Sequence, residues 1–572
     1  MRILAFHPGA HDASAAAFDG YRLIAVVSEE RLNRIKGWGD AIPWLVVDEV
    51  LRIAGWTRRD VDAIASTRAF YPAGYVRAPL YREIDHALRR WRGKEPGLRE
   101  MWRECQRQRT TDTTKVFARD RFLVHNGFRA DARYHFANHH EAHALPALFF
   151  TDWHDALVFT ADGIGDNVSY SIRTLKEGAL ACHFGDDRFL LQKLAANSIG
   201  QAYSFATALC GFTKLRHEGK LTGLAAYGEP MLAPDIARHF RLGDDGLVAT
   251  QFPGEVEIGA EMTRICRGAS RETIAASIQK VTEDLMLAVM RHWLDRHKVR
   301  HLGLGGGLFA NVRLNRLLAE SCPLDEVFVF PAMGDDGLCV GAALALLLAR
   351  DGLATWLGNR YRLDTVYLGR DFDGDIDAAL EATTGLRRDG GAPLETTIER
   401  IAAGQVGAAY LGRMEFGPRA LGARSILASP ADAGVNDRLN ARLDRSEFMP
   451  FAPVVAEEDA GEVFDLGGVN RYAARFMTIC CAVRPQWRER IAAVVHIDGS
   501  ARPQIIGRAD NPLYFDVLAA FKAHTGLPVL VNTSFNVHEE PIVNRPEECL
   551  KALLDGRVDF VTTADAVWAR NP

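Results

Sequence analysis

The stretch RILAFHPGAHDASAAAF at residues 2–18 decides the expected fold, because a loop of small and polar residues separates two apolar runs. The pattern returns at residues 156–172 as ALVFTADGIGDNVSYSI. Apolar runs bounded by Gly and Asp are typical of strands joined by tight turns. Two such units predict a duplicated nucleotide-binding core in which each loop faces phosphate groups. Two ordinary hairpins in a mixed sheet would give the same pattern.

A glycine run supports the nucleotide-binding interpretation. Residues 301–317, HLGLGGGLFANVRLNRL, predict a short strand, then glycines, then a helix. Consecutive glycines let a ligand approach the backbone, and a helix N-terminus favours phosphate. We therefore predict an ATP-type fold with the nucleotide at Gly305, Gly306 and Gly307. Apolar spacing predicts a long helix over residues 270–297.

Composition limits the possible classes of protein. The chain has 572 residues, which is too many for one domain of about 150. Periodicity is lost near residues 350–366, so we divide the chain into domains at 1–358 and 359–572. With 48% hydrophobic and 25% charged residues the composition is that of a globular protein. A net charge of −5 disfavours nucleic acid as a partner.

Cysteine usage and hydropathy bear on the compartment. The nine cysteines are scattered without a CxxC spacing, which suits a reducing environment. The longest apolar run, Cys339–Ala349, is shorter than the ~20 residues that span a bilayer. We expect a cytoplasmic protein with no membrane partner. Nothing in the sequence fixes the oligomeric state.

The segment HHEAH at 139–143 is the sharpest candidate for a metal site. His139 and His143 are four residues apart, so on a helix their imidazoles share one face and can hold one metal ion. Asp335, in the loop PAMGDDG, is the best candidate for a third ligand. Two histidines and a carboxylate fit Fe(II), Mn(II) or Zn(II). A partly buried helix whose histidines bond to the backbone is the alternative.

Two further polar residues lie near the first loop. His11 could act as a general base, since the pKa of histidine lies near operating pH. A local hydrogen bond would explain it equally well. Lys36 follows the charged run SEERLNR and could be an ordinary surface lysine.

The C-terminal part contains a candidate phosphate site. Arg419, Arg424 and Arg502 lie among Gly, Pro and Phe rather than among other charges. Asn532 and Ser534 follow a buried apolar run directly. Buried arginines need anionic partners, and amides with hydroxyls complete a phosphate cradle. A surface arginine run is the alternative.

Ten segments in order resemble the O-carbamoyltransferases of antibiotic and nodulation-factor biosynthesis, the family of nebramycin 5′ synthase and the cephalosporin carbamoyltransferase. They are HDASAA (11–16), EER (29–31), NHHEAHA (138–144), DGIGD (162–166), HEGKLTGLAAYG (217–228), GLGGGLFAN (303–311), PAMGDDG (331–337), GRMEFGPRALGARSIL (412–427), HIDGSARPQ (496–504) and VNTSFN (531–536). The resemblance implies an α/β protein with an actin-like ATPase (Kae1-like) N-terminal domain and a YrdC-like C-terminal domain.

The resemblance also implies an activity. The YrdC-like domain would make carbamoyl adenylate from carbamoyl phosphate and ATP, and the Kae1-like domain would transfer the carbamoyl group to a hydroxyl of a small natural product or sugar. The implied cofactors are ATP, with Mg²⁺ as an option, and a divalent metal. That metal is Fe(II) in the family, with Mn(II) or Zn(II) as alternatives.

Site residues carry over by motif. His139, His143 and Asp335 match iron ligands, His11 the catalytic histidine and Lys36 a substrate-side lysine. Further matches are Asp162 and Ser534 to nucleotide contacts, and Arg419, Arg502 and Asn532 to carbamoyl phosphate contacts.

The chain departs from the family at several positions. Leu443 and Met449 stand where relatives have a lysine and an arginine, so Arg442 or Arg445 could supply the anion contact instead. Gly9 replaces an acidic residue of an aminoglycoside-modifying relative, which disfavours an aminated sugar as acceptor. Residues 70–125 are expected to cap the acceptor cleft. A tRNA threonylcarbamoyl-type modification protein and a non-catalytic ATP-binding regulator are the competing functions.

Overall fold

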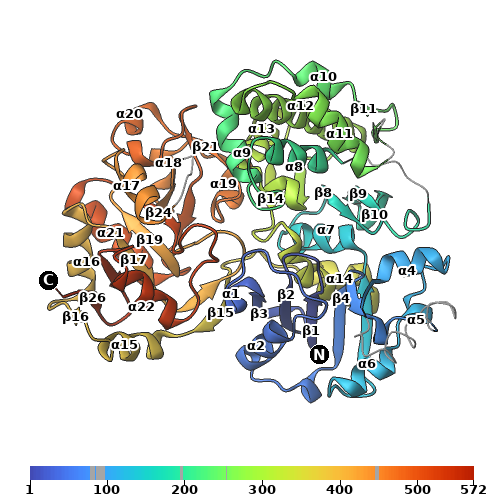
Figure 1. The fold of residues 1–572 in the computed structure, drawn as a ribbon, viewed down its shortest axis with the longest axis horizontal. Helices are drawn as coiled ribbons and strands as arrows, with labels where there is room; N and C mark the ends of the chain where they lie inside the picture. Colours follow the sequence, from blue (N-terminus) through green and yellow to red (C-terminus); the bar gives the residue numbers. More distant parts are fainter. Residues whose placement is uncertain are drawn as a thin grey trace.

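The computed structural model describes residues 1–77, 84, 97–192, 198–250, 252, 254–444 and 450–571. The N-terminal part consists of a blue half and a green half, and the orange to red C-terminal part lies beside both (Figure 1). Each half is built on one five-stranded sheet. The chain is therefore an α/β protein with an internal duplication, as the repeated strand–loop–strand pattern predicted.

The first sheet has the strand order β3-β2-β1-β4-β7. β1 pairs with β2 in antiparallel and with β4 in parallel orientation, and β4 is parallel to β7. The strands are β1 Arg2–His7, β2 Ser14–Asp19, β3 Arg22–Ser28, β4 Ala63–Thr67 and β7 Arg133–Ala137. Because β1 and β4 are buried along almost their whole length, they form the centre of this half.

The second sheet repeats that topology in the order β10-β9-β8-β13-β14. β8 is antiparallel to β9 and parallel to β13, and β13 is parallel to β14. The strands are β8 Ala156–Gly165, β9 Val168–Lys176, β10 Ala179–Phe184, β13 His301–Gly305 and β14 Glu326–Val329. The loop after β1 and the end of β8 thus occupy equivalent places in the two halves.

Two helices fill the space between the sheets. α14 (Leu338–Gly358) packs against the first sheet, and α7 (His139–Phe149) packs against both α14 and the second sheet. Their side chains share one apolar cluster with inward-facing residues of β1 and β8. Asp335–Gly358 is the one described helix long and apolar enough to cross a membrane, but most of it is buried in this layer.

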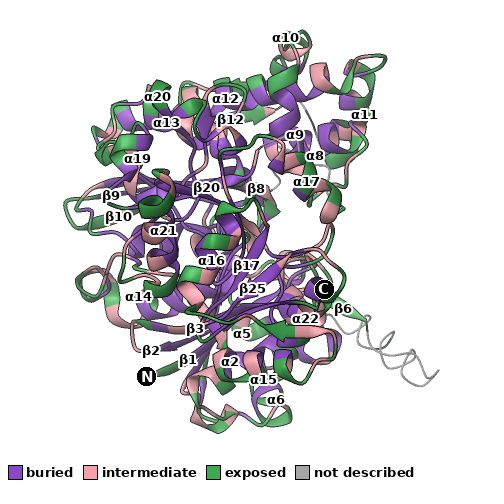
Figure 2. Ribbon diagram, turned by 90° about the vertical axis from the view of Figure 1, so that its left-hand side faces the viewer, coloured by how far each residue is buried: buried purple, intermediate pink, exposed green. Residues whose placement is uncertain are grey.

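Other helices cover the outer faces. α2 (Trp44–Ala54) covers the first sheet, and α8 (Ile199–Leu209) with α12 (Arg271–His297) packs over the second. α12 confirms the long helix predicted from apolar spacing. α4 (Met101–Arg107) and α6 (Arg119–His125) contribute to the aromatic core beside α2. Purple buried strands inside green exposed helices show this layering in Figure 2.

The C-terminal part is an eight-stranded mixed sheet in the order β16-β26-β25-β17-β19-β24-β20-β23. Its strands are β16 Leu386–Arg388, β17 Gly407–Tyr410, β19 Arg424–Ala428, β20 Ala452–Ala456, β23 Gln504–Ile506, β24 Val529–Ser534, β25 Phe560–Thr562 and β26 Val567–Arg570. α16 (Pro393–Ala402) and α21 (Pro512–Thr525) share one apolar cluster with this sheet. α15 (Asp373–Glu381) pairs with α22 (Pro546–Leu554).

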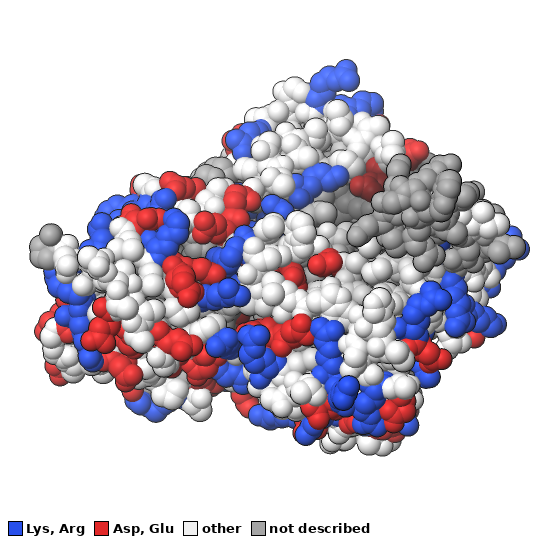
Figure 3. All heavy atoms as spheres, turned by 60° about the horizontal axis from the view of Figure 1, so that its bottom comes forward, with Lys and Arg blue, Asp and Glu red and all other residues white. Residues whose placement is uncertain are grey.

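Hydrogen bonds tie the C-terminal part to both N-terminal halves. Arg31 donates to the Gly417 carbonyl at 2.7 Å, and Asn315 donates to the Thr478 carbonyl at 2.8 Å. Tyr472, on α19 (Gly468–Ala474), donates to the Phe150 carbonyl at 2.7 Å. α14 ends at Gly358, and the division of the chain there stays a prediction. On the face drawn in Figure 3, basic and acidic side chains are interspersed.

Candidate metal centre and anion site

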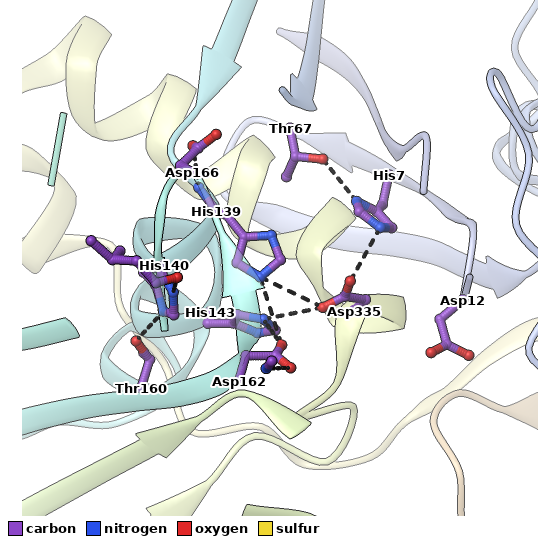
Figure 4. A network of polar contacts seen from close by, with 12 residues as sticks. His7, Asp12, Thr67, His139, His140, His143, Thr160, Asp162, Asp166 and Asp335 are labelled. Atoms are coloured by element: carbon purple, nitrogen blue, oxygen red, sulfur yellow. Dashed lines mark hydrogen bonds and ion pairs between the residues drawn. The ribbon is translucent and has the colours of Figure 1, made fainter. Parts of the chain in front are cut away.

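Four side chains from the two N-terminal halves converge in the layer between the sheets. His139 and His143 come from the first turns of α7, Asp162 from β8 and Asp335 from the short helix η5 (Asp335–Gly337) (Figure 4). One ligand-type atom of each lies within 4.8 Å of those of the other three. The structure therefore brings the three predicted metal ligands together and adds Asp162, which was predicted as a nucleotide contact. That nucleotide contact stays a prediction.

The shortest contacts in this group join one imidazole to two carboxylates. The Nε2 atom of His143 lies 2.9 Å from Oδ2 of Asp162 and 3.3 Å from Oδ1 of Asp335. The Nε2 atom of His139 lies 3.6 and 3.7 Å from those two carboxylates. The donor set is thus two imidazole nitrogens and two carboxylate oxygens around one point.

Close backbone packing holds the two histidines in place. The Asn138 side chain accepts from the Glu141 amide at 3.1 Å and so caps the start of α7. A Cβ atom on Gly305 would lie 2.5 Å from the His143 carbonyl oxygen, and one on Gly165 would lie 2.1 Å from the His139 ring. Only glycine allows the strands to approach the helix this closely.

The charges in the group stabilise one another. Burial alone would raise the pKa of Asp162, but its contacts with His139 and His143 hold that pKa well below its usual range. Burial alone would lower the pKa of His143, yet the two carboxylates raise it to about 9. Both carboxylates are therefore ionised, as ligands of a cation must be.

Buried donor atoms in this group fit a divalent cation. Nε2 of His139 and Oδ1 of Asp335 are buried and have no hydrogen-bond partner among the described residues. Such atoms cost free energy unless something binds them. His140, in the same motif, instead contacts Thr160 Oγ1 at 2.8 Å and the Val168 carbonyl at 3.0 Å. The alternative of histidines bonded to the backbone therefore describes His140, whose ring contacts the Val168 carbonyl.

His11 lies beside this group, in the loop between β1 and β2. Its Nδ1 atom is 2.9 Å from Oδ2 of Asp12 and 3.9 Å from Oδ2 of Asp335. Burial alone would lower the pKa of His11, but the hydrogen bond with Asp12 and the nearby carboxylates raise it to about 10. The imidazole is therefore positioned at the mouth of the group and holds a proton as long as those carboxylates are uncompensated.

The glycines at positions 305, 306 and 307, at the end of β13 and after it, differ in what surrounds them. Gly305 and Gly306 are buried against backbone, since a Cβ atom on Gly306 would lie 2.2 Å from the Ala161 carbonyl oxygen. Gly307 is exposed, and a Cβ atom there would meet only the Asp162 carboxylate, at 3.4 Å. Close packing against the backbones of α7 and β8 thus explains Gly305 and Gly306, and Gly307 is the glycine that is open to a ligand.

Lys36 lies near Glu539 of the C-terminal part. Its charge helps to lower the pKa of Glu539, although burial acts in the opposite direction. The next residue, Gly37, accepts the Asp12 amide through its carbonyl at 3.3 Å. The Lys36 loop therefore packs on the His11 loop at the boundary with the C-terminal part.

The predicted anion-binding residues lie around β24, an interior strand of the C-terminal sheet. Burial raises the pKa of Cys480 to about 12 against the nearby positive charges of Arg502 and Arg419, which places both guanidinium groups near one thiol. Asn532, on β24, donates to the Ala420 carbonyl at 3.2 Å. Its Oδ1 atom is buried and has no partner among the described residues. Ser534 ends the same strand.

Arg424 does not belong to this anion site. It is fully buried, its guanidinium lies 3.7 Å from the Tyr410 ring centroid, and it donates to the Leu411 carbonyl at 3.0 Å. The interpretation of Arg424 as an anion contact was wrong, because both of its terminal nitrogens, Nη1 and Nη2, donate to backbone carbonyls.

The departures from the family pattern are partly explained. Leu443 is buried in the apolar core, which a lysine would not tolerate without rearrangement. Arg442 is paired with Asp559 at 2.9 Å, so its charge is already compensated. Arg445 and Met449 lie outside the described residues, as do 78–83 and 85–96 of the segment expected to cap the acceptor cleft.

A second histidine–carboxylate cluster joins the two parts of the chain. Nε2 of His217, at the start of α9 (Glu218–Leu224), lies 2.5 Å from Oε1 of Glu539, and Nε2 of His538 lies 3.2 Å from the same oxygen. The Thr213 amide donates to Nδ1 of His217 at 3.2 Å. A neutral imidazole has one acceptor nitrogen, so Nε2 carries the proton and cannot bind a metal. His217, His538 and Glu539 thus form a polar contact between the N-terminal and C-terminal parts, called the latch below.

Sequence reasoning missed two residues of the first group. His7, the last residue of β1, lies 3.6 Å from Asp335. Asp166 accepts the His139 amide at 2.9 Å and pairs with Arg68 at 3.2 Å. The DGIGD motif at residues 162–166 could have pointed to Asp166 as a functional residue. His7 carried no such signal, because it only ends an apolar strand.

Two family models match the chain. Carbamoyltransferase N-terminus covers residues 2–344, and Carbamoyltransferase C-terminus covers residues 398–570. The chain belongs to the carbamoyltransferase family. Both models lie within the two parts of the fold described above, so this carbamoyltransferase contains a duplicated N-terminal part and a C-terminal sheet domain of its family.

Curated relatives agree with this assignment. The nodulation protein NolNO of Sinorhizobium fredii is 33% identical over 96% of this chain and 77% of its own. An uncharacterised protein of Methanocaldococcus jannaschii is 33% identical over 76% of this chain and 73% of its own. The 3'-hydroxymethylcephem-O-carbamoyltransferase of Amycolatopsis lactamdurans is 27% identical over 95% of both chains. The relatives from Sinorhizobium fredii and Amycolatopsis lactamdurans therefore align with nearly the whole of the present chain.

Among solved structures, full-length HypF in its phosphate- and nucleotide-bound form is 12% identical over 62% of this chain and 56% of its own, with a TM-score of 0.34.

Proposed function

We propose that this carbamoyltransferase is an ATP-dependent O-carbamoyltransferase. The C-terminal domain forms carbamoyl adenylate from carbamoyl phosphate and ATP, and the N-terminal domain transfers the carbamoyl group to a hydroxyl of a small natural product or sugar. A relative named as an O-carbamoyltransferase that aligns over 95% of both chains supports a hydroxyl acceptor.

The first reaction balances with water as co-reactant. Water cleaves carbamoyl phosphate to carbamate and phosphate. A carbamate oxygen then attacks the α-phosphorus of ATP, forming the C–O–P bond of carbamoyl adenylate and releasing pyrophosphate. Arg419 and Arg502 suit the phosphate oxygens of carbamoyl phosphate. The buried Oδ1 atom of Asn532 suits the carbamoyl amino group, and Ser534 suits a phosphate of ATP.

The second reaction releases AMP. The acceptor hydroxyl attacks the carbamoyl carbon, the bond to the adenylate oxygen breaks, and the hydroxyl proton leaves. His11 is the group proposed to take that proton, because it lies at the mouth of the buried cluster. Asp162 and Gly307 lie next to each other and are the proposed nucleotide contacts. Lys36, at the domain boundary, is proposed to contact the acceptor.

His139, His143, Asp335 and Asp162 would hold a divalent cation, proposed as Fe(II), with Mn(II) and Zn(II) as alternatives. When bound, such a cation supplies a Lewis acid for the carbamoyl carbonyl and neutralises the carboxylates that keep a proton on His11. The protein's own contribution is to fix the ligands, exclude water and place the imidazole.

One observation carries the proposal: His11 lies 3.9 Å from Asp335, within the group of imidazoles and carboxylates at equivalent ends of the two duplicated sheets. A non-catalytic regulator would not need a proton acceptor there. Nucleic acid as acceptor is disfavoured by the net charge of −5. The acceptor is therefore proposed to be a small molecule.

The first experiment omits the acceptor. Purified protein is incubated with ATP and carbamoyl phosphate, and pyrophosphate, AMP and carbamoyl adenylate are followed by mass spectrometry. We expect pyrophosphate release that depends on carbamoyl phosphate and is lost in Arg502→Ala. Arg490→Ala, an arginine whose donor is used by the Gly526 carbonyl, is the matched control and should be active.

Release of pyrophosphate without carbamoyl phosphate would contradict carbamate as the attacking group. Binding of ATP with no turnover in folded, metal-loaded protein would favour the regulator. His11→Asn should leave pyrophosphate release intact and stop product formation with a hydroxyl acceptor; unchanged product formation would remove His11 from the mechanism.

A further inference from the structure

His7 is a buried histidine that the proposed reaction does not use. It is the last residue of β1 and is 2% exposed. Its Nδ1 atom lies 2.7 Å from the hydroxyl of Thr67, the last residue of the neighbouring strand β4. Its Nε2 atom has no hydrogen-bond partner among the described residues. A buried ring nitrogen left in this way costs free energy unless it serves a purpose.

The Nε2 atom of His7 faces one specific oxygen. It lies 3.6 Å from Oδ2 of Asp335, as the dashed line in Figure 4 shows. The other oxygen of that carboxylate, Oδ1, faces His143 at 3.3 Å and His139 at 3.7 Å. The two oxygens of Asp335 therefore serve different partners, the inner one the metal-type group and the outer one His7.

Hydrogen-bond chemistry fixes what His7 can do there. An ionised carboxylate only accepts, whereas the Thr67 hydroxyl can donate or accept. The neutral tautomer that suits both neighbours carries its proton on Nε2, toward Asp335, and accepts from Thr67 through Nδ1. A charged ring has a proton on both nitrogens. In either state Nε2–H points at Asp335, so the arrangement does not depend on titration.

The backbone makes room for this ring. A Cβ atom on Gly9 would lie 2.3 Å from the Nε2 atom of His7, so no larger residue fits at position 9 while His7 keeps its place. Position 9 is one at which the chain departs from an aminoglycoside-modifying relative. The His7 ring takes the space that a side chain at position 9 would need.

We infer that His7 is a positioning residue of the metal centre, which holds the outer oxygen of Asp335 and leaves the inner oxygen for the cation. The inference rests on the proposed metal site. His7 is not a further ligand, because its Nε2 faces the oxygen turned away from His139 and His143. Groups that orient a ligating side chain from outside the coordination sphere typically change metal affinity tenfold to a hundredfold.

Titration of the metal-free protein with Co²⁺ tests the inference without any turnover. The readouts are the dissociation constant and the visible absorption of bound Co²⁺, which reports the coordination geometry. We expect His7→Phe, which keeps a ring but removes both nitrogens, to weaken binding about 10- to 100-fold and to change the spectrum. His7→Gln should restore most of the affinity, since its amide can donate to Asp335.

Two further variants keep the test decisive. Thr67→Val removes the hydroxyl that orients the ring and should weaken Co²⁺ binding in the same direction, by less, even if His7→Phe fails to fold. His183→Phe is the matched control. It removes another histidine–threonine pair, Thr174 Oγ1 to His183 Nε2 at 2.8 Å on the outer strands of the second sheet, and should leave Co²⁺ binding unchanged.

The outcomes separate this inference from the metal site itself. Wild-type affinity and spectrum in folded His7→Phe would overturn the role of His7 while the metal site stands. Equal, weak Co²⁺ binding in wild type and His139→Ala would overturn the metal site and the inference with it. Loss of affinity in both His7→Phe and His7→Gln would indicate that the imidazole packs rather than donates, and would also overturn the inference.

Discussion

Two histidine–carboxylate clusters in this protein look alike in composition and differ in what they can do. The group of His139, His143, Asp162 and Asp335 lies between the duplicated sheets, and two of its donor atoms are buried without a hydrogen-bond partner in the described part of the chain. The cluster of His217, His538 and Glu539 lies at the domain boundary. There the Thr213 amide donates to Nδ1 of His217, so the ring proton lies on Nε2. Nε2–H then donates a hydrogen bond to Glu539.

The difference teaches that the ring nitrogens' other partners decide whether a cluster can bind a metal. A backbone N–H that occupies one nitrogen of a neutral imidazole leaves a proton on the other. Lys220 adds to the contrast, because its Nζ atom lies 3.5 Å from Nε2 of His538 and opposes a cation there. The first cluster is suited to a metal ion and the second to an ion-pair latch.

The largest expected effect is on the first cluster. His143→Ala should abolish metal binding and slow carbamoyl transfer by roughly a thousandfold, if the cation supplies about 4 kcal/mol to the transition state. Carbamoyl-phosphate-dependent pyrophosphate release should be unchanged, because the site proposed for that reaction lies in the C-terminal part. Metal content by mass spectrometry and product formation with a hydroxyl acceptor check both parts. Full transfer activity in a metal-free variant would break the comparison.

The next effect concerns the packing that only the first cluster has. Gly305→Ala places a Cβ atom 2.5 Å from the His143 carbonyl oxygen, so strand and helix must separate, at a typical cost of about 1–3 kcal/mol. We expect Tm to fall by several degrees and metal affinity to fall with it. Gly307→Ala is the control, since its Cβ atom meets only the Asp162 carboxylate at 3.4 Å. Equal Tm in the two variants would contradict the packing role of Gly305.

A count of bound metal sharpens the contrast directly. Wild-type protein should bind one ion per chain, and Glu539→Gln should still bind one, because Nε2 of His217 carries a proton and Lys220 lies 3.5 Å from Nε2 of His538. If the second cluster also held a metal, wild type would bind two ions and Glu539→Gln would bind one. Equilibrium dialysis against Co²⁺ distinguishes these results.

The smallest effect is the pH dependence of the latch. Burial acts to raise the pKa of Glu539, but the hydrogen bond from His217 and the nearby positive charges lower it overall. A carboxyl group whose pKa is lower in the folded state stabilises the protein at neutral pH and loses that contribution as pH falls through its folded pKa. Glu539→Gln should therefore lower Tm by about 1 °C at pH 7. The difference should vanish in acid; a difference that grows on acidification would contradict the latch.

Several features of the fold were readable from local pattern. The strand–loop–strand repeat at residues 2–18 and 156–172 predicted a duplicated nucleotide-binding core; the duplication is seen in two sheets of equivalent strand order, and the nucleotide stays a prediction. The apolar spacing over residues 270–297 predicted α12. These predictions held because side-chain periodicity depends on the geometry of a single element.

Other features could not be read from local pattern. The glycine run was predicted as a nucleotide contact, whereas Gly305 and Gly306 pack against the backbones of α7 and β8. Arg424 was grouped with the anion contacts and instead stacks on Tyr410. The glycine contacts lie more than a hundred residues away in sequence, and the Arg424 contact depends on the pairing of β17 with β19, neither of which residue spacing reveals.

The sequence by itself determined the types of element, the duplication and the residues able to bind metal or phosphate, because chemistry and periodicity are properties of the chain. Only the tertiary structure decided which donors meet, which ring nitrogen is occupied, and that His7 faces the outer oxygen of Asp335. Those facts depend on contacts between strands and helices more than a hundred residues apart, such as His7 with Asp335 and His143 with Gly305. Burial then sets the cost of every donor left without a partner.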